Sequence, residues 1–209
     1  MLSALSDLPP YLRVDNFLGD RLVAELLAHV AAHEPKFMTA RVADARLDRS
    51  IRRSSIIRDL GEVREAVATR LGAIAERATR ELNLPPLATG SLELELAAHG
   101  DGAYYREHID TATGNPGSTT ARALAGVCYF YRQPKAFSGG ELRIHAIAPA
   151  GAGARLFTDI VPDCGLLLLF PAWAPHEVRP VNVPSGAFLD SRFAINCWFH
   201  HQWDGAMRR

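Results

Sequence analysis

The 209-residue sequence predicts a mainly β protein, an antiparallel sandwich or jelly roll packed against N-terminal helices. Two observations carry this prediction. Residues 20–82 contain two segments whose apolar residues recur every three or four positions, as on one face of a helix. From 91 to 200 the pattern changes to short apolar or alternating runs separated by Gly, Pro and Asn, which is typical of strands joined by turns. We therefore expect one domain over 1–209, with helical support in 1–88 and a β core in 89–203.

The composition is that of an ordinary globular protein, 48% hydrophobic and 22% charged. Lys+Arg and Asp+Glu both number 23, so a net charge of zero provides no drive toward nucleic acid or an anionic membrane. Three cysteines without a CxxC pair argue against a disulfide framework and a thiolate zinc site, and favour a reducing compartment. No signal-peptide pattern and no apolar run near the ~18 residues of a membrane span are present, so we expect a cytoplasmic protein.

The N-terminal elements follow in order. Residues 11–17 predict a short strand, and Asp20 is the predicted N-cap of a helix that runs to about residue 33. Residues 36–42 predict another strand. Residues 43–53 are charged and aperiodic and predict a mobile surface loop, which is either a solvated face or a flap that closes over a substrate.

A short strand at 54–57 precedes the longest predicted helix, 61–82, which ends before Pro85-Pro86. The β core then begins at SLELELAAH, in which leucines alternate with Glu93 and Glu95 as in a half-buried strand. The remaining predicted strands are 124–131, 141–147, 156–161, 166–170, 176–181 and 192–200.

Candidate metal ligands stand at His108, Asp110 and His176. A His and a carboxylate two positions apart lie on the same side of an extended segment. His176 begins a predicted strand about seventy residues later, and strands distant in sequence lie side by side in a jelly roll. Two imidazoles and one carboxylate form the facial triad that holds non-haem Fe(II) with open coordination positions.

The last predicted strand, RFAINCWFH, carries a second signal. Arg192, Asn196 and Trp198 share one of its faces, which is unusual for a solvated strand and favours a lined pocket. The other face is apolar and predicts packing between layers. An arginine in such a pocket binds a carboxylate through two parallel hydrogen bonds. An iron oxygenase needs this group for the distal carboxylate of 2-oxoglutarate.

The ordered motifs HID, YFY, SGGELRI, LFP, HEVRPV and RFAINCWF resemble those of the 2-oxoglutarate/Fe(II) dioxygenases of the prolyl-hydroxylase superfamily. The resemblance covers about 92–203 and is closest to the branch of the hypoxia-sensing prolyl hydroxylases and their bacterial relatives. It implies a double-stranded β-helix core of the jelly-roll or cupin-like kind, with Fe(II), 2-oxoglutarate and O2 as cofactor and co-substrates.

The resemblance also implies roles for particular residues. His108, Asp110 and His176 would be the iron ligands, and Arg192 would bind the distal carboxylate of 2-oxoglutarate. The other implied co-substrate residues are Tyr129, which would hydrogen-bond that carboxylate, and Tyr105, Leu142 and Trp198, which would line the pocket. Core or rim packing is the competing interpretation for the two tyrosines.

Two departures from the family pattern concern the pocket. His99 stands near a position where relatives often carry a tyrosine, and we expect it, with Asn196, to be a substrate contact or a strand end. The gap between His176 and Arg192 is long and predicts an extended loop. Arg179 is an alternative anchor, but it lies on the opposite strand face from His176.

Three functions remain open from the sequence. The first is hydroxylation of a protein or peptide, at proline. The second is hydroxylation of a small molecule such as a free amino acid. The third is a metal-binding β-barrel without turnover, or a zinc hydrolase. A hydrolase needs a general base beside the metal, but Glu107 and Glu177 are predicted to point to the faces opposite the ligands. The oligomeric state is not predicted.

Overall fold

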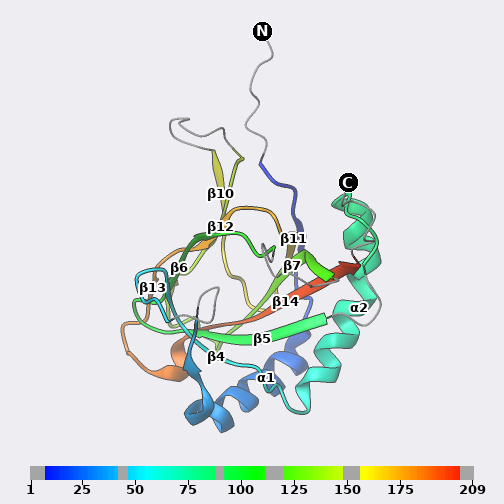
Figure 1. The fold of residues 1–209 in the computed structure, drawn as a ribbon. Helices are drawn as coiled ribbons and strands as arrows, with labels where there is room; N and C mark the ends of the chain where they lie inside the picture. The colour runs from blue at the N-terminus through cyan, green and yellow to red at the C-terminus, as the bar shows by residue number, and fades with distance from the viewer. Residues whose placement is uncertain (1–7, 42–46, 88–91, 112–119, 148–155, 203–209) are drawn as a thin grey trace.

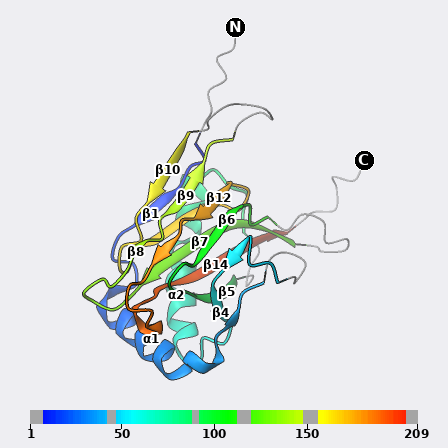
Figure 2. The ribbon, with the colours of Figure 1, turned by 90° about the vertical axis from the view of Figure 1, so that its left-hand side faces the viewer.

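The structure is a computed structural model that describes residues 8–41, 47–87, 92–111, 120–147 and 156–202. Two antiparallel sheets face each other and enclose one apolar core (Figures 1 and 2). The larger sheet has seven strands in the order β1-β11-β7-β14-β5-β4-β2, and the smaller has five in the order β10-β9-β12-β6-β3. A separate two-stranded ribbon joins β13 to β8. This arrangement is the predicted jelly roll.

The strands of the larger sheet are β1 (Leu12–Val14), β2 (Met38–Thr39), β4 (Ser55–Ile57), β5 (Leu92–His99), β7 (Thr120–Phe130), β11 (Leu167–Pro171) and β14 (Arg192–Gln202). The strands of the smaller sheet are β3 (Arg52–Arg53), β6 (Tyr104–His108), β9 (Leu142–His145), β10 (Phe157–Ile160) and β12 (His176–Val178). The ribbon consists of β8 (Ser138–Gly139) and β13 (Val181–Asn182), and short 3-10 helices span Glu34–Lys36 and Phe188–Asp190.

The helices α1 (Gly19–His33) and α2 (Val63–Glu81) lie against the outer face of the larger sheet (Figure 1). The predicted apolar stripe of each helix is buried: Leu26 of α1 and Leu71 of α2 are both 0% exposed. They pack against alternate residues of β14, such as Phe193 and Ile195. The intervening residues of β14 face the apolar core between the two sheets. The predicted alternation along β14 is therefore confirmed.

The element boundaries differ from the prediction in several places. Asp20 is not an N-cap, because α1 begins at Gly19 after Leu18, and no side chain caps it. The strand predicted over 36–42 is reduced to Met38–Thr39, because a 3-10 helix occupies Glu34–Lys36. The strand Tyr104–His108 was not predicted, because its buried and exposed positions do not alternate.

The prediction of a solvated loop over 43–53 is wrong at its end. Residues 43–46 lie outside the described ranges, whereas Arg52 and Arg53 form β3 and pair with Tyr105 and Tyr104 of β6. Arg52 is only 8% exposed. The chain then crosses from the smaller sheet to the larger one at Ser54, so this charged segment closes one side of the sandwich.

All three cysteines are free, and none belongs to the group of candidate metal ligands found in the part of the chain that the structure describes. Within the same residues, no helix is both long enough and apolar enough to cross a membrane.

Candidate metal centre and its cavity

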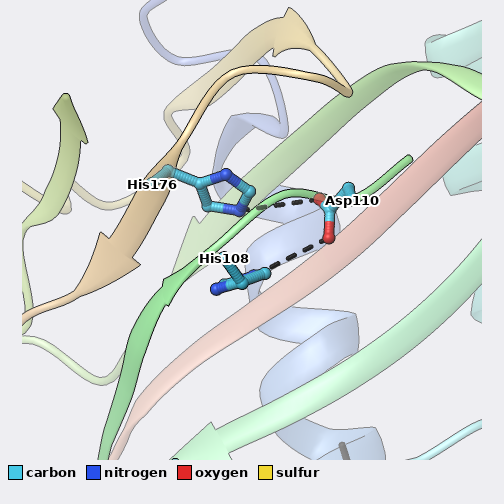
Figure 3. A group of neighbouring side chains, drawn as sticks. All are labelled: His108, Asp110 and His176. Atoms are coloured by element: carbon cyan, nitrogen blue, oxygen red, sulfur yellow. Dashed lines mark ion pairs between the residues drawn. The ribbon is translucent and has the colours of Figure 1, made fainter. Parts of the chain in front are cut away.

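The three predicted metal ligands meet at one point between the sheets (Figure 3). His108 ends β6, Asp110 follows two residues later, and His176 begins β12. The strands β6 and β12 are antiparallel neighbours in which His176 stands directly opposite His108. Backbone hydrogen bonds from Asp110 and Thr111 to the carbonyl of Ala172 hold the segment after β6 against the turn before β12. The pairing of β6 with β12 thus brings together ligands that lie about seventy residues apart in the sequence.

The ligand atoms of the three residues lie within 4.8 Å of one another. His108 Nε2 is 3.7 Å from Asp110 Oδ1, and His176 Nε2 is 3.6 Å from Asp110 Oδ2. These separations are too long for hydrogen bonds and suit donors that share an ion. Two imidazoles and one carboxylate also match the donor set that non-haem Fe(II) takes in its facial triad. The residues present therefore fit an iron ion.

Both imidazoles are fixed in the tautomer that a metal requires. The Nδ1–H of His108 donates to the carbonyl of Arg106 at 2.8 Å, and the Nδ1–H of His176 donates to the carbonyl of Ala174 at 2.8 Å. A carbonyl only accepts, so the proton of each neutral ring is on Nδ1 and the Nε2 lone pair is free. Such contacts behind a ligand orient it.

The electrostatics of the site favour the same protonation states. Burial, followed by the neighbouring His176, lowers the pKa of His108 to about 3. Burial alone would raise the pKa of Asp110, but the two histidines and a hydrogen bond from Trp198 outweigh it, so the pKa is lowered. At neutral pH His108 is therefore uncharged and Asp110 is a carboxylate, as metal ligands must be.

A cavity of about 40 Å³ opens beside the triad. Nine of the ten predicted site residues line it: His99, Tyr105, His108, Asp110, Leu142, His176, Arg192, Asn196 and Trp198. Tyr105 stacks on His108 with ring centroids 3.6 Å apart, so it packs against a metal ligand. The tenth residue, Tyr129, lies behind Arg192, with its ring centroid 4.6 Å from the guanidinium carbon.

Arg192 is the most deeply buried charged side chain of the cavity, at 1% exposure. Its Nη1 lies 3.3 Å from His99 Nδ1, but Nε and Nη2 have no hydrogen-bond partner among the described residues. The hydroxyl of Tyr129, which is 0% exposed, also lacks one. Burial lowers the pKa of Arg192, and Tyr129 partly opposes this effect. Buried polar groups are normally paired, so these three donors fit the carboxylate of a bound ligand.

The backbone conformation and the close surroundings of the two glycines in SGGELRI explain why glycine stands at both positions. Gly139 and Gly140 adopt φ of +72° and +75°, which favour glycine. A Cβ on Gly139 would lie 2.2 Å from the carbonyl oxygen of Pro180, and one on Gly140 would lie 2.6 Å from Cδ of Arg192. The absence of a side chain at Gly140 therefore leaves the space that the aliphatic part of Arg192 occupies.

Trp198, which also lines the cavity, is supported by an ion pair of Arg122 and Glu93, which we call the clamp. The guanidinium carbon of Arg122 lies 3.9 Å from the indole centroid, and Arg122 makes two hydrogen bonds to Glu93, at 3.3 and 2.7 Å. His200 also contacts Glu93. Because Trp198 donates a hydrogen bond to Asp110, this clamp supports the carboxylate ligand.

Sequence reasoning missed Arg52, which lines the cavity beside Tyr105. Its Nη2 donates to Oε1 of Glu95 at 2.9 Å, and its Nε donates to Ser54 Oγ at 3.0 Å. Glu95 is itself only 4% exposed. Glu95 could have indicated Arg52, because Glu95 lies on the same face of β5 as His99, which lines the cavity, and a buried carboxylate needs a cationic partner.

Three other titratable residues stay outside the cavity. Glu177 and Glu107 approach His145 instead, at 3.4 and 3.9 Å from its Nε2. Neither carboxylate lines the cavity, as the strand alternation predicted. Arg179 donates to Glu177 and is also absent from the cavity lining. Neither a general base for a zinc hydrolase nor a second arginine anchor is found at these positions.

With this geometry established, comparison with known proteins identifies the class. The model of the 2OG-Fe(II) oxygenase superfamily matches residues 94–200, just over half of the chain. The protein belongs to this superfamily, the 2OG-Fe(II) oxygenases. An uncharacterised PKHD-type hydroxylase of Synechocystis sp. is 39% identical over 121 residues, covering 56% of this chain and 39% of the relative. The match thus spans about two fifths of the length of that curated relative.

Solved structures share the fold across most of the chain. A Pseudomonas putida prolyl-4-hydroxylase has a TM-score of 0.67 at 22% identity, covering 92% of this chain and 94% of that one. A Trichoplax adhaerens prolyl hydroxylase, solved with a hypoxia-inducible factor peptide, has a TM-score of 0.66 at 22% identity, covering 95% and 87%. The epimerase SnoN of nogalamycin biosynthesis has a TM-score of 0.62 at 16% identity, covering 92% and 78%. These likenesses confirm the predicted jelly-roll core.

Proposed function

We propose that the protein is a hydroxylase in which His108, Asp110 and His176 bind Fe(II) and Arg192 anchors 2-oxoglutarate. The observation that carries this proposal is the presence, in one cavity, of a two-histidine-one-carboxylate triad and a buried guanidinium edge without a partner among the described residues. The reaction converts 2-oxoglutarate, O2 and a C–H bond of the substrate into succinate, CO2 and an alcohol. We also propose that 1–209 form a single oxygenase domain.

The iron and the keto acid supply the oxidising chemistry when they are bound. The residues of the chain bind, orient and exclude water. Nε and Nη2 of Arg192 and the hydroxyl of Tyr129 would donate hydrogen bonds to the distal carboxylate of 2-oxoglutarate. Leu142 is 1% exposed and gives the cavity an apolar wall, while Tyr105 covers His108. A dry cavity strengthens each of these electrostatic contacts.

The substrate we propose is a prolyl residue of a protein or peptide. Support comes from the motif resemblance, the PKHD-type relative and two prolyl hydroxylases that share the fold. A small-molecule substrate is the second candidate, because SnoN, an epimerase of nogalamycin biosynthesis, also shares the fold. Asn196 lines the cavity and is the proposed substrate contact, and Trp198 is proposed to lie beside the co-substrate, whereas the position of His99 points to a different role. We further propose that the protein has no nucleic-acid partner, because its net charge is zero. We also propose that it acts in the cytoplasm, because its three cysteines are free.

The first test is coupled turnover. The protein is incubated with Fe(II), 2-oxoglutarate and O2, and succinate is measured with and without added substrate mixtures. We expect succinate from the wild-type protein and none above background from His176→Ala. Equal succinate from both proteins would refute the assignment of His176, and none from either would favour a metal-binding protein without turnover.

The second test separates the two substrate classes. A peptide library containing proline and a metabolite extract are each treated with the enzyme and analysed by mass spectrometry for the gain of one oxygen atom. Oxygenated proline in peptides is the expected result. A product found only among metabolites would establish the small-molecule alternative.

A further inference from the structure

His99 occupies an unusual position for a residue expected to touch substrate. It is the last residue of β5 and stands directly opposite Arg192, the first residue of β14. It is only 3% exposed, and its Nδ1 lies 3.3 Å from Nη1 of Arg192. A guanidinium only donates hydrogen bonds, so His99 accepts through Nδ1 and carries its proton on Nε2. Burial, and then the facing cations Arg192 and Arg52, lower the pKa of His99, so its imidazole is neutral.

This hydrogen bond determines which part of the guanidinium stays available. A guanidinium is planar and presents its N–H groups in a fixed fork. With Nη1 directed at His99, the free side of the plane is the Nε–Nη2 edge, and these are the two atoms without a partner among the described residues. An Nε–Nη2 edge binds a carboxylate through two parallel hydrogen bonds.

Arg192 is thus held at two points along its length. Cδ runs past Gly140 through a space so narrow that a Cβ on this glycine would lie 2.6 Å from it. His99 holds Nη1 at the far end. The glycine limits where the side chain runs, and the histidine limits rotation of the guanidinium plane. Tyr129 lies across the guanidinium face, with a centroid distance of 4.6 Å.

We propose that His99 is a positioning residue for the co-substrate: it locks the guanidinium of Arg192 so that the Nε–Nη2 edge receives the distal carboxylate of 2-oxoglutarate. This inference rests on the proposed function. It replaces the expectation that His99 contacts the substrate, because His99 acts through Arg192. A site of this kind loses affinity when the supporting contact is removed, since an unlocked arginine must be ordered again for each binding event.

The test uses two substitutions at one position. His99→Asn places an amide oxygen where Nδ1 was and keeps an acceptor for Nη1. His99→Leu keeps a similar bulk without an acceptor. Calorimetry on the Mn(II)-loaded proteins measures the affinity for 2-oxoglutarate and for 2-oxobutyrate, a keto acid without the distal carboxylate. Mn(II) avoids turnover, so the readout is binding alone.

We expect His99→Leu to weaken 2-oxoglutarate about 10- to 100-fold, the size of a lost hydrogen bond to a charged group. Binding of 2-oxobutyrate should change by less than about 2-fold, and His99→Asn should restore most of the affinity for 2-oxoglutarate. Thermal melting checks that each variant is folded, and His99→Met replaces His99→Leu if the latter is not.

Other outcomes overturn the inference. Equal weakening of both keto acids would mean that His99 supports the cavity in general. Unchanged 2-oxoglutarate affinity in the folded acceptor-free variant would mean that Arg192 needs no lock. If His99→Asn behaves like His99→Leu, the accepted hydrogen bond is not the cause. A wild-type protein that binds neither keto acid would refute the proposed function itself and, with it, this inference.

Discussion

Two arginines line the same cavity, and both are buried, yet they differ in their partners. Arg52 is 8% exposed and forms an ion pair with Glu95, whose carboxylate is also buried. Arg192 is 1% exposed, and no carboxylate lies within ion-pair distance of it among the described residues. One charge is therefore balanced within the protein, and the other is not.

The difference separates a structural role from a binding role. A buried charge is costly unless it is paired and hydrogen-bonded. The pair of Arg52 and Glu95 joins β3 of the smaller sheet to β5 of the larger one, so it closes the side of the sandwich. Arg192 keeps two nitrogens, Nε and Nη2, without a hydrogen-bond partner among the described residues. The comparison thus supports the proposal that Arg192 binds the carboxylate of the co-substrate.

The largest expected effect is on stability, at Arg52. Arg52→Leu would leave the carboxylate of Glu95 buried with only the exposed Arg58 nearby, at 3.5 Å. We expect a loss of about 3 kcal/mol in the free energy of unfolding, near the low end for a broken buried pair. Urea denaturation of the metal-free protein measures it. The double variant Arg52→Leu with Glu95→Leu is the control and should recover most of the loss. A loss below about 1 kcal/mol, the value of a surface pair, would contradict the structural role.

Arg192→Leu should give the opposite pattern. It removes an unpaired buried charge, so the metal-free protein should melt at the same temperature or higher. Affinity for 2-oxoglutarate, measured on the Mn(II)-loaded protein, should fall by about 100-fold or more, because the distal carboxylate loses its partner. Arg192→Lys is the matched control that keeps the charge without the fork. Strong destabilisation with unchanged affinity would reverse the roles assigned to the two arginines.

Acid should act on His108, the neutral histidine of the proposed metal site. The pKa of His108 is about 3 in the folded protein, against about 6.5 in an unfolded chain. Above pH 6.5 both states are neutral and the stability is complete. As the pH falls from 6.5 toward 3, only the unfolded chain takes up the proton, so the metal-free protein loses about 2 kcal/mol by pH 5.

Denaturation at pH 7 and pH 5 measures this loss. His108→Gln has no group to titrate there, so its stability should fall less between the two values. The same fall in the variant and the wild-type protein would assign the acid sensitivity to other groups, such as His99, whose pKa is lowered by burial and then by Arg192 and Arg52.

The smallest expected effect is at Trp198, beside the partly exposed ion pair of Arg122 and Glu93. Trp198→Phe keeps a ring against Arg122 but removes the N–H that reaches Asp110. We expect affinity for Co(II) or Mn(II) to fall about 10-fold, the low end for one lost hydrogen bond to a charged group. Arg122→Met tests the clamp separately and should have a weaker effect. If Trp198→Phe binds metal as well as the wild type, Asp110 needs no support from the indole.

The sequence predicted those parts of the site that depend on local strand geometry. Alternation along β14 placed Arg192 and Trp198 on one face, and the start of β12 placed His176 in reach of His108. Arg52 was missed because Glu95, its partner, is 43 residues away. Only the pairing of β3 with β6 and of β4 with β5 brings the two together, and a charged segment without periodicity resembles a solvated loop.

The strand β6 was missed for a related reason. Tyr104 and Tyr105 are both partly buried and Arg106 and Glu107 are both exposed, so β6 lacks the alternation by which strands are predicted. The role of His99 was also beyond the sequence, since its contact with Arg192 depends on the register of β5 against β14.

The most direct test of the proposed metal and co-substrate site is an anaerobic absorption titration. Fe(II) is added to the protein, followed by 2-oxoglutarate, and the visible spectrum is recorded at each step. We expect a charge-transfer band that saturates at one equivalent of iron in the wild-type protein and is absent in His176→Ala. No band in the wild-type protein, or an undiminished band in His176→Ala, would contradict binding of iron and 2-oxoglutarate at His108, Asp110 and His176.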